Sequence, residues 1–457
     1  MQRDRRQFLA SVGALAAATA CDEPANPAAP KPSEPAPDRS PEPAPWAAPG
    51  TLDSLAFPGG VRAGDATSDG AILSVRTTEP TIDLLVMVAA ADGWEEVARH
   101  DGLTPVEGNV QFELEALASD SAYAAVFLAG DRRSATVRFR TAIPSGGWRK
   151  VVFAATSCLG SADPSWASLA EIASFDPDFT LLLGDTVYAD GSLTAEDYRA
   201  EWERAFANES LQALFARSSL IATWDDHEVA NNWVRSEGDL LHTAVTDEQL
   251  ATATTVFRDA LPMRVGPGGN GLWRKLGWGV VDVFVLDSRG ERSKGKIVSD
   301  EQLAWLQEEL HASEAAFKII MASVHVTDHY DLMSTGAADD RWQGYPAQRD
   351  ALIAAIVEVA GVFVVTGDMH YGGVQRIDPE GGPAADRWEI AAGPAGSSLF
   401  PLSAVAQIGG DGVPAQYDAV IEDWTSCLFV ADPGLGTLTV QFIGNDGGIR
   451  AERTLSA

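Results

Sequence analysis

The sequence predicts an α/β fold in which a layered αββα domain follows a small all-β sandwich of immunoglobulin or fibronectin type. Short β-like segments separated by Gly, Asp and Ser fill residues 51–143, a spacing typical of a sandwich. Over residues 148–457 the pattern changes to continuous apolar runs that alternate with helical stretches. Such runs indicate strands covered on both faces, and their alternation with helices predicts the layered domain.

The predicted elements can be given by their residue ranges. The sandwich strands are expected at residues 71–77, 84–89, 110–114, 123–128 and 136–141. The buried strands of the layered domain are expected at residues 151–155, 179–183, 220–223, 280–286, 319–323 and 362–366, with helices at 195–215 and 300–313.

The first 50 residues are predicted to direct export and to carry no fold. Residues 1–21 contain the pair Arg5-Arg6, continue with small apolar residues and end at Cys21. This order predicts a signal for the twin-arginine export machinery, with Cys21 as a lipid attachment site that would anchor the chain to a membrane. Residues 22–50 hold ten of the 25 prolines and are expected to form a semi-rigid tether. We therefore expect a periplasmic or cell-surface protein.

The charge of the chain excludes one class of partner. There are 33 basic and 65 acidic residues, which gives a formal net charge of −32. Nucleic-acid binding needs clustered Lys and Arg, so no nucleic-acid partner is expected. The three cysteines are too few for a disulfide framework, and the sequence leaves a pair between Cys158 and Cys427 open.

Polar residues follow the end of each of the six apolar runs. In open α/β sheets ligands bind beyond the carboxyl ends of strands, so these residues are expected to converge. Carboxylate, imidazole, phenol and thiol groups together are the donor set of a transition-metal site. The endings supply Cys158, Asp185 with Tyr188, Asp226 with His227 and Asn232, Arg289, His325, and Asp368 with His370.

The order of these motifs resembles the calcineurin-like metallophosphoesterases and, more narrowly, the alkaline phosphatase D family. The resemblance covers nearly everything after the tether, including residues 51–143, which are similar to that family's N-terminal sandwich. The narrower match is carried by Val61-Arg62-Ala63-Gly64-Asp65, Ser157-Cys158, Gly184-Asp185-Thr186-Val187-Tyr188, Asp225-Asp226-His227-Glu228-Val229 with Asn231-Asn232, Asp340-Arg341-Trp342-Gln343-Gly344-Tyr345 with Arg349, and Thr366-Gly367-Asp368-Met369-His370.

This resemblance implies a site with two or more metals, a ferric iron and a second divalent ion that is calcium, manganese or zinc. Asp185 would bridge the ions. The iron would also be held by Cys158, Tyr188 and His370. The second metal would be held by Asp226, His325 and Asp368, and the imidazole of His325 favours a transition metal there.

The implied function is that of an exported metal-dependent phosphoric ester hydrolase, an alkaline phosphatase acting on a small phosphate ester, in which a metal-activated hydroxide attacks phosphorus. His227, beside the ligand Asp226, would contact the phosphate or protonate the leaving group. Asn232 and Arg289 are candidate phosphate contacts. Two alternatives stay open: phosphodiesterase or phospholipase D-type activity on the same metals, and a surface binding module with an inactive hydrolase domain.

Overall fold

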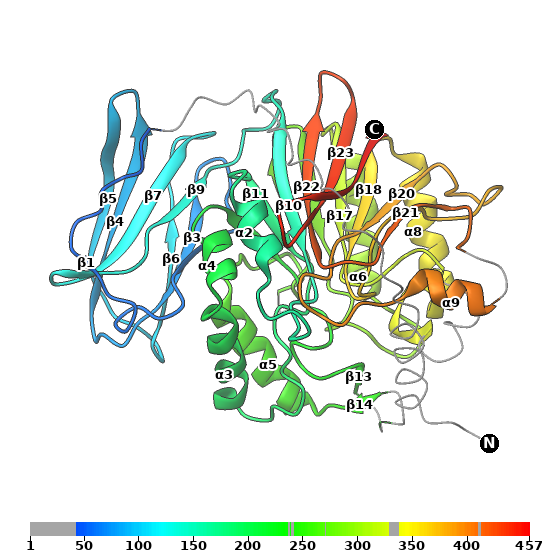
Figure 1. Ribbon diagram of the computed structural model, residues 1–457, viewed down its shortest axis with the longest axis horizontal. Coiled ribbons are helices and arrows are strands. Elements are labelled where there is room, and N and C mark those ends of the chain that lie inside the picture. Colours follow the sequence, from blue (N-terminus) through cyan, green and yellow to red (C-terminus); the bar gives the residue numbers. More distant parts are fainter. Residues whose placement is uncertain (1–42, 236–237, 239–241, 270, 329–337, 410–412) are drawn as a thin grey trace, which may run out of the picture.

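The computed structural model describes residues 43–235, 238, 242–269, 271–328, 338–409 and 413–457 (Figure 1). The predicted export signal, Cys21 and most of the proline-rich segment lie outside these residues and stay predictions. Within the described part of the chain, no helix combines the length and the apolar character that crossing a membrane requires.

Two large β-sheets form the centre of the molecule. In the described residues, one has the strand order β24-β23-β22-β10-β11-β12-β2-β3-β6 and the other β15-β16-β17-β18-β20-β19-β21. The strands of the first sheet are β24 (Ile449–Ser456), β23 (Thr437–Gly444), β22 (Thr425–Asp432), β10 (Val151–Thr156), β11 (Phe179–Leu182), β12 (Ser219–Ala222), β2 (Val61–Gly64), β3 (Ala71–Arg76) and β6 (Asn109–Leu114). Those of the second are β15 (Arg274–Trp278), β16 (Val281–Val285), β17 (Phe317–Met321), β18 (Val362–Thr366), β20 (Trp388–Ala391), β19 (Gly372–Arg376) and β21 (Tyr417–Ile421).

The inner faces of these sheets share one apolar core. Phe153 stacks on Phe179 and Phe429 within the first sheet, and Phe179 contacts Trp278 of the second sheet with ring centroids 5.0 Å apart. Both strand sets belong to one cluster of buried side chains. Because the six apolar runs of the sequence are buried on both faces, they form β10, β11, β12, β16, β17 and β18, as predicted.

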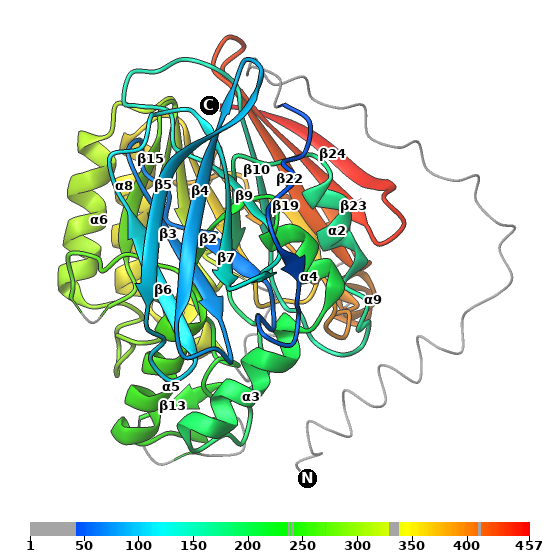
Figure 2. The same cartoon turned by 90° about the vertical axis from the view of Figure 1, so that its left-hand side faces the viewer.

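Helices cover the outer faces. The first sheet is covered by α2 (Ala167–Ala173), α3 (Ala195–Phe206), α4 (Glu209–Phe215) and α5 (Asp247–Ala260), and the second by α6 (Asp300–Ala312) and α8 (Pro346–Glu358). Figure 2 shows α6 and α8 on one side and α2 on the other, with the sheets between them. A further short helix, α9 (Leu402–Gly409), lies near β21. The layers confirm a mixed α/β fold of αββα type. The single helix expected at 195–215 is two helices, because α3 ends at its C-cap Ala207 and the Asn208 side chain caps the start of α4.

The N-terminal region forms a second β layer over part of the first sheet. Its strands are β1 (Thr51–Leu52), β8 (Arg132–Arg133), β7 (Ala122–Ala129), β4 (Ile82–Ala90), β5 (Gly93–Leu103) and β9 (Val137–Arg140). The opposite layer, β2-β3-β6, continues into the large sheet through parallel pairing of Ala63 with Ser219 and of Gly64 with Leu220. A self-contained sandwich is therefore not confirmed, and the boundary near residues 143–148 stays a prediction.

The cysteine pair that the sequence left open does not form. Cys158 lies just beyond β10 and Cys427 lies within β22, and both are buried free thiols. Cys427 packs in the shared apolar core, whereas Cys158 lies among polar groups at the end of its strand.

Candidate metal centre

Three neighbouring parallel strands and a facing strand bring the predicted ligands together. β10, β11 and β12 pair in parallel, as do β16, β17 and β18 of the opposite sheet. Their carboxyl ends therefore meet at one edge of the double layer. The described residues contain three groups of ligand atoms that each lie within 4.8 Å of one another. They are Cys158 with Asp185 and His370, Asp185 with Asp226 and His227, and Asp225 with Asp226 and Asp368.

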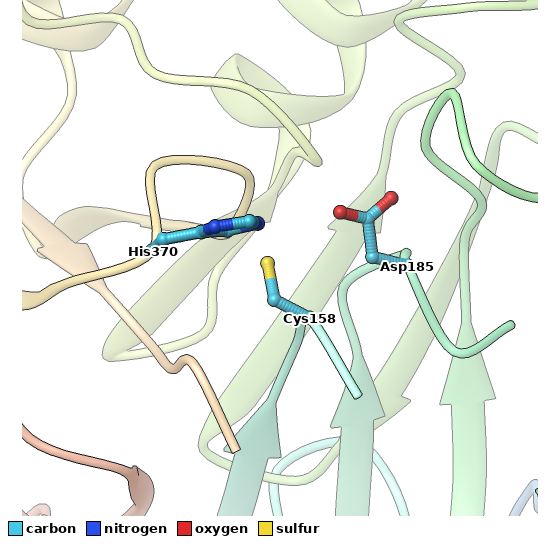
Figure 3. A group of neighbouring side chains, drawn as sticks. All are labelled: Cys158, Asp185 and His370. Atoms are coloured by element: carbon cyan, nitrogen blue, oxygen red, sulfur yellow. The ribbon is translucent and has the colours of Figure 1, made fainter. Parts of the chain in front are cut away.

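Asp185 and Asp226 link these groups into one site. Asp185 belongs to the first two groups and Asp226 to the last two. Figure 3 shows the Cys158 thiol between the His370 ring and the Asp185 carboxylate. A carboxylate shared between two ligand groups is suited to bridging two ions, the role that the sequence predicts for Asp185. Tyr188 joins the first group, since its hydroxyl lies 3.3 Å from Asp185 Oδ2 and 3.5 Å from His370 Nε2.

Unusual backbone conformations mark the same residues. Cys158, Asp185, Asp368 and His370 have φ values of 57°, 54°, 66° and 57°, in the left-handed region that non-glycine residues seldom adopt. Each such residue costs about 1–3 kcal/mol unless its surroundings fix it, and such residues cluster at functional sites. Here the sharp turn after each strand places a ligand side chain over the strand ends.

The donor set fits a cation. Asp185 Oδ1 is buried and, among the described residues, has no hydrogen-bond partner. Burial raises the pKa of Asp185 well above its usual range, and the nearby Asp226 and Asp225 charges add to this effect. Burial and the Asp185 charge likewise raise the pKa values of Cys158 and Tyr188. Buried carboxylates this close repel one another, and a bound metal reverses the penalty because it favours the deprotonated ligands.

Glu228 ties two strand-end loops together beneath the site. Its Oε2 accepts the backbone N–H groups of Asp185 at 3.0 Å and Asp225 at 2.8 Å, and its Oε1 accepts that of Thr186 at 2.6 Å. Burial raises the pKa of Glu228 to about 7. The side chain therefore fixes the loop after β11 relative to the loop after β12, and sequence analysis gave it no role although it stands in the Asp-His-Glu motif.

Arg289 lies among four carboxylates and is fully buried. Its Nε is 2.6 Å from Asp225 Oδ1 and its Nη2 3.0 Å from Asp225 Oδ2, and Nη1 bonds to Asp340. Asp226 and Asp368 lie 3.4 and 3.7 Å from Nη2. This arrangement favours a role in holding the ligand carboxylates over the direct phosphate contact predicted for Arg289. Sequence analysis quoted Asp340 within a motif but gave it no role, because its contact with Arg289 is made by tertiary packing.

His227 and Asn232 border the site. His227 Nδ1 lies 3.0 and 2.8 Å from the two oxygens of Asp190. Although burial opposes a charged ring, the Asp226 and Asp185 carboxylates raise the pKa of His227 to about 11. The backbone N–H of Asn232 donates to Asp226 Oδ2, and its side-chain amide lies 3.3 Å from that oxygen and 3.1 Å from Asp340 Oδ2 when its nitrogen faces them. Asn232 thus positions Asp226, while Asp190 is a contact that sequence analysis missed.

His325 is a predicted ligand of the second metal, and its surroundings are buried groups of the second sheet. It is fully buried, and its Nδ1 lies 3.5 Å from the Tyr371 hydroxyl. In the described residues it belongs to none of the three ligand groups. Its role as a ligand of the second metal stays a prediction.

Comparison with known proteins identifies the family. The fold and ligand groups agree with the class that the motifs resemble, the phosphoric ester hydrolases. A family model described as PhoD-like phosphatase matches residues 153–416, more than half of the chain, and the chain belongs to this family.

Individual relatives of this family are similar to the chain in sequence and in fold. Alkaline phosphatase D of Bacillus subtilis (strain 168) is 24% identical over 388 residues, which cover 71% of this chain and 66% of that protein. The structure of PhoD has a TM-score of 0.74 at 21% identity and covers 88% of this chain and 90% of that chain. A purple acid phosphatase from yellow lupin (Lupinus luteus) seeds has a TM-score of 0.62 at 13% identity, covering 87% of this chain and 73% of that chain. At these identities the two structures show a shared fold.

Proposed function

We propose that this protein is an exported, metal-dependent alkaline phosphatase that hydrolyses small phosphate monoesters. One observation carries the proposal: Asp185 and Asp226 join three groups of metal-type ligands into a single buried site. Family membership and the similarity to alkaline phosphatase D support it. The twin-arginine-like start and the proline-rich segment support a periplasmic or cell-surface location, with Cys21 as the lipid anchor.

The ligand types suggest which ions the site takes. Cys158, Tyr188 and His370 next to Asp185 suit ferric iron, since a thiolate and a phenolate together offset much of a trivalent charge. Asp226 and Asp368, with Asp185 shared, provide oxygen ligands for calcium, manganese or zinc. When bound, two such ions supply Lewis-acid charge and a hydroxide nucleophile near neutral pH.

His227 is suited to move the proton that the reaction requires. A ring nitrogen of His227 lies within 4.8 Å of ligand oxygens of Asp185 and Asp226. Asp190 occupies Nδ1, which leaves Nε2 to act on the substrate. The imidazole, held in position by Asp190, can donate a proton to the departing ester oxygen, giving the alcohol.

The charge of the protein favours small substrates. A net charge of −32 repels long polyanions at low salt and leaves small monoesters less affected. Phosphodiesters and phospholipids are the alternative substrates, because the same ligands serve both reactions. A binding module with an inactive hydrolase domain would be expected to have lost ligands, whereas Cys158, Asp185, Asp226, Asp368 and His370 are all present and grouped.

Parallel assays of two chromogenic esters test the proposal. The metal-loaded full chain is expected to have a higher kcat/KM for p-nitrophenyl phosphate than for bis(p-nitrophenyl) phosphate. A preference for the diester would establish the phosphodiesterase alternative. Turnover of neither ester by protein with verified metal content would favour the binding module.

A further inference from the structure

One buried arginine, Arg341, has unused hydrogen-bond donors in the part of the chain that the structure describes. Arg341 is 4% exposed, and within the described residues its Nε and Nη2 have no hydrogen-bond acceptor. Its Nη1 makes one weak contact, 3.7 Å from the Met369 sulfur. Burying a cation without a paired anion is unfavourable by several kcal/mol. The unused donors therefore call for an anionic ligand.

Other buried arginines show what a satisfied guanidinium looks like in this protein. Arg289 directs Nε and Nη2 at the two oxygens of Asp225, and Arg274 does the same with Asp65 at 2.6 and 2.8 Å. These two N–H groups form the fork that binds two oxygens of one anion in parallel. In Arg341 the same two groups, Nε and Nη2, have no acceptor among the described residues.

The nearby carboxylates are engaged by other groups. Burial raises the pKa of Asp328, and the positive charges of Arg349 and Arg341 oppose that rise. Asp328 is therefore close enough to Arg341 to interact with its charge. Asp328 is nevertheless paired with Arg349, with Nε and Oδ1 3.1 Å apart. Glu389 is fully buried and accepts two backbone N–H groups and a threonine hydroxyl. Neither carboxylate supplies the anion for the fork.

Arg341 borders the loop that carries two metal ligands. Arg341 touches the side chain of Met369, the residue that lies between Asp368 and His370 in the sequence. Its chain neighbour Asp340 bonds to Arg289 inside the carboxylate cluster. The Arg341 guanidinium therefore lies beside the loop that carries Asp368 and His370.

We propose that Arg341 is a phosphate-binding residue whose Nε and Nη2 hold two oxygens of the phosphoryl group, and that it selects monoesters. A phosphomonoester has three terminal oxygens and a diester has two. If Arg341 binds two terminal oxygens, a monoester has one terminal oxygen left to bind the metals. A diester has none left. This selectivity rests on the proposed function, whereas binding of inorganic phosphate by Arg341 does not.

The test uses inorganic phosphate as the probe and three variants of the full, metal-loaded protein. Arg341→Met removes the positive charge but keeps a side chain of similar length. Arg341→Lys keeps the charge but lacks the two parallel N–H groups of the guanidinium. We expect the inhibition constant of phosphate to rise about 10- to 100-fold in the Met variant, because a charge-assisted hydrogen-bond pair is lost. The rise is expected to be smaller in the Lys variant. The ratio of diester to monoester kcat/KM is expected to rise in both.

Stability separates binding from a structural role. Arg349→Met is the matched control, because Arg349 is also buried but is paired with Asp378 at 2.7 Å. Arg349→Met is expected to lower the melting temperature and leave phosphate inhibition unchanged. Arg341→Met is expected to keep or raise the melting temperature, because it removes an unpaired buried charge, and to lose most of the thermal shift that phosphate causes.

The outcomes decide between the two proposals. Unchanged phosphate binding in Arg341→Met, or a loss of stability like that of Arg349→Met, would overturn the role of Arg341. A wild type that turns over monoesters but shows no phosphate-dependent shift would also overturn it. A wild type that hydrolyses no ester but loses its phosphate-dependent shift on Arg341→Met would refute the proposed function and support the binding residue.

Discussion

Both carboxylate oxygens of Asp190 lie within hydrogen-bond distance of His227 Nδ1, at 3.0 and 2.8 Å. Asp190 is itself fixed, since it accepts the backbone N–H of Asn231 at 2.6 Å. The imidazole is therefore held through one nitrogen, with the other available at the edge of the metal centre. Orienting a proton donor in this way matters most when the departing group is a poor one.

Asp190→Asn is expected to reduce kcat more for phenyl phosphate than for p-nitrophenyl phosphate. The amide keeps an acceptor for Asn231 but holds the imidazole without the carboxylate charge, so protonation of a poor leaving group slows by about 10- to 100-fold, part of the usual gain from acid catalysis. The ratio of the two rates is the measurement. An equal loss on both esters would show that Asp190 serves folding or metal binding instead.

Glu228→Gln is expected to destabilise the protein and lower its metal content. The carboxylate accepts three buried backbone N–H groups, and an amide has one oxygen with which to replace two. At least one donor is left unsatisfied, at a cost of about 1–3 kcal/mol in the free energy of unfolding. Denaturant unfolding measures the loss, with Glu308→Gln on the exposed face of α6 as control. Equal stability of the two variants would contradict the role of Glu228.

Tyr188→Phe is expected to abolish any visible charge-transfer band of the iron-loaded protein. Ser397 Oγ bonds to the Tyr188 hydroxyl and accepts the Gly160 N–H at 3.1 Å, so its own proton is free to donate to the phenol oxygen. Ser397→Ala should therefore shift the band and keep it. Tyr198→Phe is the control, because Tyr198 bonds to a backbone carbonyl outside the ligand groups. A colourless, iron-free and fully active wild type would contradict the ferric assignment.

Cys158→Ser and Cys427→Ser are a matched pair of buried substitutions. Both thiols are fully buried, but only Cys158 lies with Asp185 and His370. Cys158→Ser is expected to lose both iron and activity, because a serine hydroxyl is a poorer metal ligand than a cysteine thiolate. Cys427→Ser is expected to lower stability and to retain iron, because it places a hydroxyl in the apolar core. Iron and activity retained in Cys158→Ser would assign Cys158 to packing.

The secondary structure was largely predictable because apolar runs record burial directly. Runs such as 151–155 and 362–366 became β10 and β18. β5, which is largely exposed and rich in charged residues, was not predicted, since it lacks a buried face that a pattern could reveal. The pairing of β2 with β12 was also missed, because contacts between distant segments leave no local signal.

The site was predictable to the extent that strand ends carry it. Asp185, Asp226 and His370 could be placed together because parallel strands end at one edge. Asp190 and Asp340 act through side chains far away in the sequence, and polar residues of these types are common in loops. Their roles became visible only through the distances.

The most direct test of the metal-centred account compares metal content and ester hydrolysis in wild type and Asp185→Ala, with Asp92→Ala in an exposed turn as control. The account predicts that wild type and Asp92→Ala bind metal and release nitrophenol from p-nitrophenyl phosphate, and that Asp185→Ala loses both together. Metal content or hydrolysis near the wild-type level in Asp185→Ala would contradict the bridging role and, with it, the centre proposed for this protein.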